Sequence, residues 1–186
     1  MKRCSWVKEN NPLYVAYHDL EWGIPLHDER ALFELLCLET YQAGLSWETI
    51  LNKRAAFRQA FHGYDVHQVA VMTDAELEGI LQNPAVVRNR RKIYATRANA
   101  QAFLKIQAEF GSFDHYLWSF VGFTPIDNSV KDYRLAPSKT SLSEKIAKDM
   151  KQRGFKFVGP VCVYSFMQAA GLVNDHETSC EWNPKK

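Results

Sequence analysis

Hydrophobic residues recur along most of the chain at spacings of three and four, the period of an α-helix. The clearest run begins after Asp28, a candidate N-cap, and ends at Gly44. Its apolar face holds Leu32, Leu35 and Leu36. Almost no stretch alternates between apolar and polar residues for long enough to make a strand. The pattern therefore predicts an all-α fold.

A helix capped by Ser46 is expected next, followed by two helices that a tight hairpin joins. The first of these two covers about residues 73–82, and the second covers about residues 87–109. An Asn-Pro-Ala sequence separates them, because the residue before a proline is pushed out of the helical conformation. The sequence thus predicts a hairpin at residues 83–88.

The rest of the chain is less regular. A helix is expected around residues 115–121, followed by a long surface loop and two further helices. The two chain ends show no periodicity, so something other than helix packing must order them. We expect one unit with a helical bundle at about residues 28–121 and a second lobe made from residues 1–27 and about 141–186.

Composition narrows the possibilities only slightly. The 186 residues are 46% hydrophobic and 24% charged, as in an ordinary globular domain. The 23 Lys+Arg against 21 Asp+Glu give a net charge of +2, which does not indicate a nucleic-acid partner. No stretch approaches the roughly 18 apolar residues of a membrane helix, so we expect a cytoplasmic protein with no membrane partner. Aromatic residues, at 13%, exceed what the core needs, so some should line a site.

Cysteine and histidine residues near the two chain ends have a spacing that suits a metal ion. His176 and Cys180 are separated by three residues, which lets both side chains reach one ion. Cys4 and His18 lie at the other end of the chain. Two thiolates and two imidazoles would form a closed, structural zinc site that clips the irregular termini together. The alternative is a free thiol at Cys4 and unrelated histidines, and spacing alone leaves both open.

One carboxylate lies within an apolar face. Glu39 follows Leu35 by four residues and Leu36 by three, so its side chain points with the apolar residues. A buried charge is costly unless it is paired, or unless a ligand supplies donors or positive charge. A tight turn and the indole of Trp47 follow soon after, and an aromatic segment near the N-terminus could close a pocket. The alternative is that Glu39 pairs with a basic side chain.

Basic residues gather in two places. The first lies at the hairpin and the start of the long helix, where it comprises Arg88, Arg90, Arg91 and Lys92. Basic side chains at a helix N-terminus oppose the helix dipole, and an incoming phosphate would relieve that conflict. The second group extends from Lys145 to Lys156. Either group could instead be a solvated helix face.

Several long segments resemble one protein family. They are RCSWV, YVAYHDLEWGIP, LCLETYQAGLSWETIL, VVRNRRKI, RGFKFVGPVCVYSFMQAAGLVNDH and the final His-x3-Cys. Together they extend from Cys4 to Cys180 and resemble the type I 3-methyladenine-DNA glycosylase family, within the helix-hairpin-helix glycosylase superfamily. The resemblance implies a helix-hairpin-helix glycosylase fold. It also implies an enzyme that flips an alkylated nucleotide out of duplex DNA and hydrolyses its N-glycosidic bond.

The resemblance also implies roles for individual residues. The family's structural zinc ligands match Cys4, His18, His176 and Cys180. Its base-reading carboxylate matches Glu39. The aromatic pocket around that carboxylate matches Tyr17, Trp22 and Trp47, with Tyr14 as a weaker neighbour.

Contacts with double-stranded DNA are expected from a loop and from the hairpin. The loop that enters the gap in the duplex matches Gly44 and Leu45. The hairpin and the start of the next helix supply Ala85, Val86, Arg88, Arg90 and Arg91. Two features depart from the superfamily pattern: Ala85 stands where a glycine is common, and no acidic residue follows the hairpin where most relatives have a catalytic aspartate. The second departure is shared by this family and changes the expected mechanism.

An adenine methylated at N3 is cationic, and its departure from the sugar neutralises it, so it needs little help from a general acid. We expect Glu39 to accept hydrogen bonds from this base while aromatic rings stack on it. Water then attacks the sugar and leaves free 3-methyladenine and an abasic site. Without an evident lysine nucleophile we expect no strand cleavage, and we expect a monomer.

Two other classes of function remain open. One is a zinc-clipped DNA-binding module without catalysis, which would need no aromatic pocket around Glu39. The other is a zinc hydrolase or nucleobase deaminase, which would need an open metal position. The deaminases also carry an H-x-E with P-C-x-x-C signature, which this sequence lacks.

Overall fold

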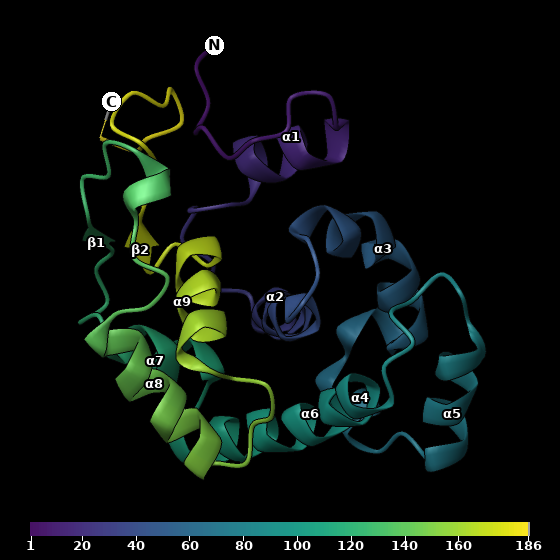
Figure 1. The fold of residues 1–186 in the computed structure, drawn as a ribbon. Helices are drawn as coiled ribbons and strands as arrows, with labels where there is room; N and C mark the ends of the chain where they lie inside the picture. The colour runs from purple at the N-terminus through teal and green to yellow at the C-terminus, as the bar shows by residue number, and fades with distance from the viewer. Residues whose placement is uncertain (186) are drawn as a thin grey trace.

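The computed structural model describes residues 1–185, and in that range the chain is mostly helical, as predicted (Figure 1). The longer elements are α1 (Pro12–Leu20), α2 (Glu29–Gln42), α3 (Trp47–Ala60), α4 (Val66–Ala70), α5 (Asp74–Gln82), α6 (Arg90–Phe110), α7 (Phe113–Ser119), α8 (Ser141–Gln152) and α9 (Pro160–Ala169). Two short strands are β1 (Ile126–Asp127) and β2 (Val173–Asn174), and short 3-10 turns cover His62–Tyr64 and Tyr133–Leu135. No helix in the described part of the chain is long and apolar enough to cross a membrane.

Helix α2 lies at the centre of the molecule, where Figure 1 shows it end-on. Helices α3, α6, α7 and α9 pack around it. Every residue from Leu32 to Tyr41 is buried, so α2 buries its whole circumference rather than one apolar face. Two glutamates of α2 are therefore buried as well, and their surroundings decide what each one does.

Most of the predicted helix starts are confirmed. The side chains of Asp28, Ser46 and Thr73 each accept a hydrogen bond from a backbone N–H of the first turn that follows. The long helix α6 starts at Arg90 rather than at residue 87, because Asn89 is its N-cap. This later start places Arg88 outside the helix.

The prediction that both chain ends lack helical periodicity was wrong for the N-terminal end. Helix α1 lies there, with Asn11 as its N-cap and Pro12 in its first turn. Its buried face holds Tyr14, Tyr17 and His18, at spacings of three and four. Because aromatic and imidazole side chains carry the period, a pattern based on aliphatic residues does not reveal it.

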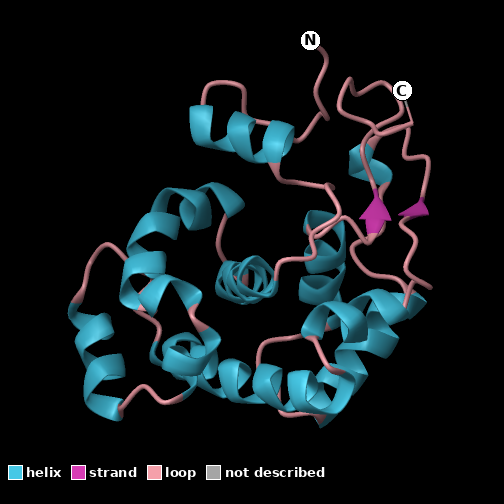
Figure 2. Cartoon of the chain, turned by 180° about the vertical axis from the view of Figure 1, so that it is seen from behind, coloured by secondary structure: helices cyan, strands magenta, loops and turns pink. Residues whose placement is uncertain are grey.

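The two chain ends lie side by side, as Figures 1 and 2 show. The N–H of Glu181 donates to the carbonyl of Lys2 at 2.9 Å, and the N–H of Lys2 donates to the Glu181 carboxylate. Strands β1 and β2 form a parallel pair, with Ile126 opposite Val173, that is too short for any alternation to predict. One hydrophobic core continues through the bundle and the end segments. The division into a bundle and a second lobe stays a prediction.

Candidate functional site

A cavity of about 220 Å³ lies beside the C-terminal half of α2. Its walls come from α1, α2, α3, α9, the N-terminal segment and the loop before α8. The lining residues are Trp6, Tyr14, Tyr17, Trp22, Glu39, Gln42, Trp47, Tyr133, Ser165 and Gln168. The structure thus brings all five predicted pocket residues, which come from three separate segments of the chain, around one space.

Glu39 is buried in this cavity and has no ion-pair partner among residues 1–185. The residue is 5% exposed, and its Oε2 has no hydrogen-bond partner among the described residues. Burial raises the pKa of its carboxyl group from 4.5 to about 8, so most of it is protonated at neutral pH in the protein alone. The alternative that Glu39 pairs with a basic side chain is therefore wrong. A carboxyl group in this position can accept hydrogen bonds and become charged when a ligand brings donors or a positive charge.

Aromatic rings surround that carboxyl group. The rings of Tyr17 and Trp47 lie 5.1 Å apart, and Trp6 packs its ring 4.9 Å from that of Trp22 and 5.6 Å from that of Tyr14. The indole N–H groups of Trp6 and Trp47 are buried and have no acceptor among the described residues. The residues that line the cavity therefore include two indole N–H groups and one carboxyl oxygen without a partner in the described part of the chain. Such a set suits a flat heteroaromatic ring with both donors and acceptors.

Half of the cavity lining was not predicted, namely Trp6, Gln42, Tyr133, Ser165 and Gln168. Gln42 follows Glu39 by three positions on α2, so helical spacing could have identified it. Ser165 and Gln168 have the same spacing on α9, but nothing in the sequence indicates that this face meets the cavity. Tyr133 belongs to an irregular loop and carries no periodic signal.

The turn after α2 carries the two residues of the predicted DNA-entering loop. Gly44 has φ +79°, a left-handed conformation that favours glycine. The N–H of Leu45 closes the turn by donating to the carbonyl of Gln42 at 2.6 Å. Leu45 is partly exposed. An exposed apolar side chain on a closed turn has the form of a wedge.

A buried lysine stabilises this turn by hydrogen bonds to its carbonyl groups. Lys92 is 6% exposed, and its Nζ donates to the carbonyls of Tyr41 at 2.7 Å and Ala43 at 2.6 Å. Burial lowers the pKa of Lys92. The prediction that Lys92 joins Arg88, Arg90 and Arg91 in one exposed basic group was wrong, because Lys92 is buried. Its ammonium group binds the C-terminal end of α2, whose carbonyls attract positive charge.

The hairpin between α5 and α6 presents fewer free groups than the sequence suggests. Val86 is buried, so its side chain is part of the core. Its N–H donates to the carbonyl of Asn83, and the N–H of the exposed Ala85 donates to the Asn83 side chain. These two predicted contact residues therefore shape the hairpin with their main chains.

The three predicted arginines differ in their surroundings. Arg90 is ion-paired with Glu78 and stacks on the ring of Tyr94 at 4.8 Å. Arg88 and Arg91 are exposed, and neither has a carboxylate partner in the described part of the chain. These two guanidinium groups are thus free to bind an external anion, whereas Arg90 must first leave its partner.

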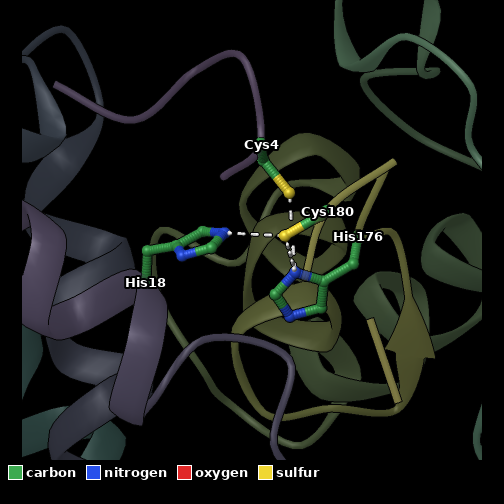
Figure 3. A group of neighbouring side chains, drawn as sticks. All are labelled: Cys4, His18, His176 and Cys180. Carbon is green, nitrogen blue, oxygen red and sulfur yellow. Dashed lines mark hydrogen bonds between the residues drawn. The ribbon is translucent and has the colours of Figure 1, made fainter. Parts of the chain in front are cut away.

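Four buried side chains meet where the chain ends come together, as Figure 3 shows. They are the predicted ligands Cys4, His18, His176 and Cys180, and one ligand atom from each lies within 4.8 Å of all the others. The Sγ of Cys180 is 3.6 Å from the Nε2 of His18 and 3.6 Å from the Nδ1 of His176. Two sulfur and two nitrogen atoms at these distances could hold one metal ion.

Hydrogen bonds outside this cluster fix both imidazole rings. The Nδ1 of His18 contacts the carboxylate of Asp19 at 2.7 Å, which turns Nε2 inward. The Nε2 of His176 contacts the carbonyl of Trp22 at 3.1 Å, which turns Nδ1 inward. Histidine ligands of metal ions commonly donate their second N–H to a carboxylate or carbonyl in this way. Burial raises the pKa of the Cys4 thiol, and a bound cation would oppose that effect.

Comparison with known proteins identifies the family of the chain. The family model for methyladenine glycosylase matches residues 6–183. DNA-3-methyladenine glycosylase 1 of Escherichia coli (strain K12) is 46% identical over 180 residues, which are 97% of this chain and 96% of that protein. A crystal structure of 3-methyladenine DNA glycosylase I matches with 48% identity and a TM-score of 0.95, covering 98% of this chain and 100% of the other.

A structure of 3-methyladenine DNA glycosylase I from Staphylococcus aureus, described as giving the structural basis of 3-methyladenine recognition, also matches closely. It is 41% identical with a TM-score of 0.95, and the match covers 100% of this chain and 98% of the other. The family indicated by the sequence segments is confirmed over nearly the whole length. The chain belongs to the methyladenine glycosylase family.

Proposed function

We propose that the protein hydrolyses the N-glycosidic bond of 3-methyladenine in alkylated DNA and leaves free base and an abasic site. The observation that carries this proposal is the buried, unpaired carboxyl group of Glu39 inside an aromatic cavity. The names of the similar proteins support it. A module that binds only phosphates would have no use for such a cavity.

The protonation of Glu39 suits a cationic base. With a pKa of about 8, the carboxyl group is mostly neutral at pH 7, which limits the cost of burying it. A cationic methylated adenine favours the ionised form, so its arrival lowers the pKa of Glu39. The charge on the protein then appears only where a charge on the base compensates it. An uncharged adenine gains less from this group and is disfavoured.

Stacking supplies the rest of the binding energy. The rings of Tyr17, Trp22 and Trp47 enclose the base, and each stacking contact contributes roughly 1–3 kcal/mol. Flipping a nucleotide out of the duplex costs a few kcal/mol, and less for a damaged base. The indole N–H groups of Trp6 and Trp47 donate to ring nitrogens of the base. These terms together favour a methylated adenine in the cavity.

The hairpin and the turn after α2 form the DNA-binding surface of this proposal. The α5–hairpin–α6 segment serves as the helix-hairpin-helix element, and Arg88 and Arg91 bind phosphates regardless of sequence. Leu45 enters the gap that the flipped nucleotide leaves. Exchanging Arg88 and Arg91 for Gln should weaken binding to any duplex and reduce the slope of affinity against salt by about 2, one unit per lost contact. An unchanged slope would move the contact surface elsewhere.

A structural zinc ion is the metal that we assign to Cys4, His18, His176 and Cys180. Two thiolates and two oriented imidazoles are a donor set typical of closed zinc sites. When bound, zinc supplies no chemistry to the reaction and holds the two chain ends together. Metal analysis of the purified protein should find about one zinc per chain. Another metal, or zinc that leaves on mutation of a surface histidine such as His62, would contradict the assignment.

The surroundings of Lys92 support hydrolysis without strand cleavage. Lys92, the buried lysine nearest to the turn after α2, gives its hydrogen bonds to two carbonyls and so is not free to attack the sugar. Cavity and metal cluster are both complete within one chain, which supports a monomer.

The test is to incubate methylated duplex DNA with the protein and to identify the released base by chromatography. We expect free 3-methyladenine, and abasic sites that break only after alkali treatment. Release of no base would contradict the proposal. Strand breaks without alkali would contradict its hydrolytic mechanism.

A further inference from the structure

A second group of polar side chains lines the cavity besides Glu39, and it begins at a buried aspartate. Asp175 accepts hydrogen bonds from the hydroxyl of Tyr164 at 2.7 Å, from the amide Nε2 of Gln168 at 2.7 Å and from the amide of Asn128 at 2.6 Å. Because all three contacts are donations to one carboxylate, the orientation of the Gln168 amide is fixed. Its nitrogen faces Asp175, and its Oε1 faces the other way.

This orientation determines what the next residue can do. The hydroxyl of Tyr133 lies 3.2 Å from the Oε1 of Gln168 and donates its hydrogen to it, since Oε1 can only accept. The phenol hydrogen is thereby used within the protein. What the Tyr133 hydroxyl has left for the cavity that it lines is the lone pairs of its oxygen atom. At this point of the wall the cavity therefore accepts a hydrogen bond and does not donate one.

Tyr133 is held in place although it belongs to a loop. Its N–H donates to the carboxylate of Glu177 at 2.9 Å, and its ring lies 6.0 Å from the rings of both Trp6 and Trp22. Burial raises the pKa of Tyr133 to about 12, so the phenol is neutral at physiological pH. The charge of Asp175, and that of Glu39 once it ionises, also raise this pKa. The hydroxyl and the Glu39 carboxyl group thus share one electrostatic environment.

We propose that Tyr133, oriented through Gln168 and Asp175, is a specificity-determining residue that favours a methylated purine carrying an exocyclic amine over one carrying a carbonyl at the same position. This inference rests on the proposed function. An amine can donate to the Tyr133 oxygen, whereas a carbonyl would place two acceptors against each other with no hydrogen between them. The free indole N–H groups still serve ring nitrogens, which both kinds of purine carry.

The experiment compares two free bases that carry an amine and a carbonyl, respectively, at this position, 3-methyladenine and 3-methylhypoxanthine. Their dissociation constants are measured by calorimetry for the wild-type protein and for Tyr133→Phe, Gln168→Met and Tyr164→Phe. Tyr164→Phe is the matched control, because its hydroxyl also donates to Asp175 but does not line the cavity. Excision of 3-methyladenine from DNA by the wild type is measured in parallel, and thermal unfolding checks that each variant is folded.

We expect the wild type to prefer 3-methyladenine, and Tyr133→Phe to reduce that preference about 3- to 10-fold, the usual worth of one neutral hydrogen bond. Gln168→Met should reduce it at least as much, because the phenol hydrogen can then turn into the cavity and donate to a carbonyl. Tyr164→Phe should keep the wild-type preference.

Three results would overturn the inference. Tyr133→Phe could keep the wild-type preference, or it could lower the affinity for both bases equally. Either result would mean that Tyr133 lines the cavity without determining specificity. Tyr164→Phe could reduce the preference as much as Tyr133→Phe, which would make the effect one of general stability. If the wild type excises 3-methyladenine while one of these results is seen, the inference alone fails. If the wild type releases no base, the proposed function fails with it.

Discussion

Two glutamates five positions apart on α2 are buried to nearly the same degree, yet their surroundings are opposite. Glu34 is 6% exposed and Glu39 is 5% exposed. The carboxylate of Glu34 accepts hydrogen bonds from Arg54 at 2.7 Å and from Arg58 at 2.7 and 3.1 Å. The Oε2 of Glu39 has no partner in the described part of the chain, and burial raises its pKa to about 8.

The contrast between Glu34 and Glu39 shows that burial alone does not distinguish a functional carboxyl group from a structural one. A buried charge with two guanidinium partners is compensated within the protein, so it can only stabilise the fold. A buried carboxyl group without partners costs stability or takes up a proton, and a ligand can recover that cost. The paired state that we considered for Glu39 on sequence grounds occurs in this helix, but at Glu34.

The two ends of α2 also differ in this way, one being structural and the other lying at the proposed functional site. At its N-terminal end, the carboxylate of Glu29 accepts hydrogen bonds from Gln107 and from the N–H groups of Phe113 and Asp114, so it joins α2 to α6 and α7. At its C-terminal end, Lys92 holds the carbonyls of the turn that presents Leu45. One end of the helix is anchored in the bundle, and the other end faces the cavity and the proposed DNA surface.

The largest effect is expected from Glu39→Gln. The exchange keeps the shape of the side chain but prevents it from becoming charged, so excision of 3-methyladenine from methylated DNA should slow about 100-fold. Thermal unfolding should show no loss of stability, since the group has no ion-pair partner to lose. A lower melting temperature would mean that Glu39 belongs to a structural network, and unchanged excision would mean that it does not read the base.

Glu34→Gln is the matched change and should do the reverse. Losing the charge-assisted hydrogen bonds to Arg54 and Arg58 should lower the free energy of unfolding by about 2 kcal/mol, as measured by denaturant titration. Excision by the folded protein, assayed well below the melting temperature, should stay near the wild-type rate. If this variant lost excision as strongly as Glu39→Gln, the presence of arginine partners would not distinguish a structural glutamate from one that reads the base.

Lys92→Met extends the comparison to the turn at the end of α2. Met fills the same volume but cannot bind the carbonyls of Tyr41 and Ala43, so the turn that carries Leu45 should loosen. Excision from duplex DNA should fall about 10-fold while the affinity for free 3-methyladenine stays unchanged. Lys105→Met, at an exposed position of α6 outside both basic groups, is the control. An equal loss of affinity for the free base would instead place the effect of Lys92 in the cavity.

The pH dependence of stability should distinguish the two glutamates further. The pKa of Glu39 is about 8 in the folded protein and near 4.5 when unfolded, so between these values the folded state binds more protons. Its contribution to stability is therefore lost as the pH rises through this window. Relative to Glu39→Gln, the wild type should lose about 1 kcal/mol between pH 6 and pH 7, measured by denaturant unfolding at each pH. If the difference in unfolding free energy between the two proteins did not change with pH, Glu39 would have an ordinary pKa.

The sequence predicted those parts of the molecule that depend on local pattern. Helix starts at Asp28, Ser46 and Thr73 were confirmed because a cap and the periodicity after it lie within a few residues. Glu39 could be identified because its position relative to Leu35 and Leu36 placed it inside the bundle. That it has no partner could not be predicted, since arginines 20 and 24 residues from Glu34 decide which glutamate is paired.

The rest of the site depends on contacts between distant segments. Tyr133 reaches the cavity through hydrogen bonds to Gln168 and Glu177, which follow it by 35 and 44 positions. Lys92 lies in a run of basic residues, and only the packing of α6 against the end of α2 separates it from its exposed neighbours. The metal ligands were identified by the spacing of His176 and Cys180, whereas the approach of the N-terminal pair depends on the fold.

Whether Glu39 is left unpaired in order to read the base can be measured by following the titration of its own carboxyl carbon. Isotope-edited NMR of the glutamate side chains, with Glu39→Gln to assign the signal, gives the pKa of Glu39 with and without 3-methyladenine. We expect a pKa of about 8 in the ligand-free protein and a clearly lower value when the base is bound, because hydrogen bonds donated by the base favour the ionised carboxylate. A pKa near 4.5 in the ligand-free protein, or one that the base does not change, would contradict this expectation.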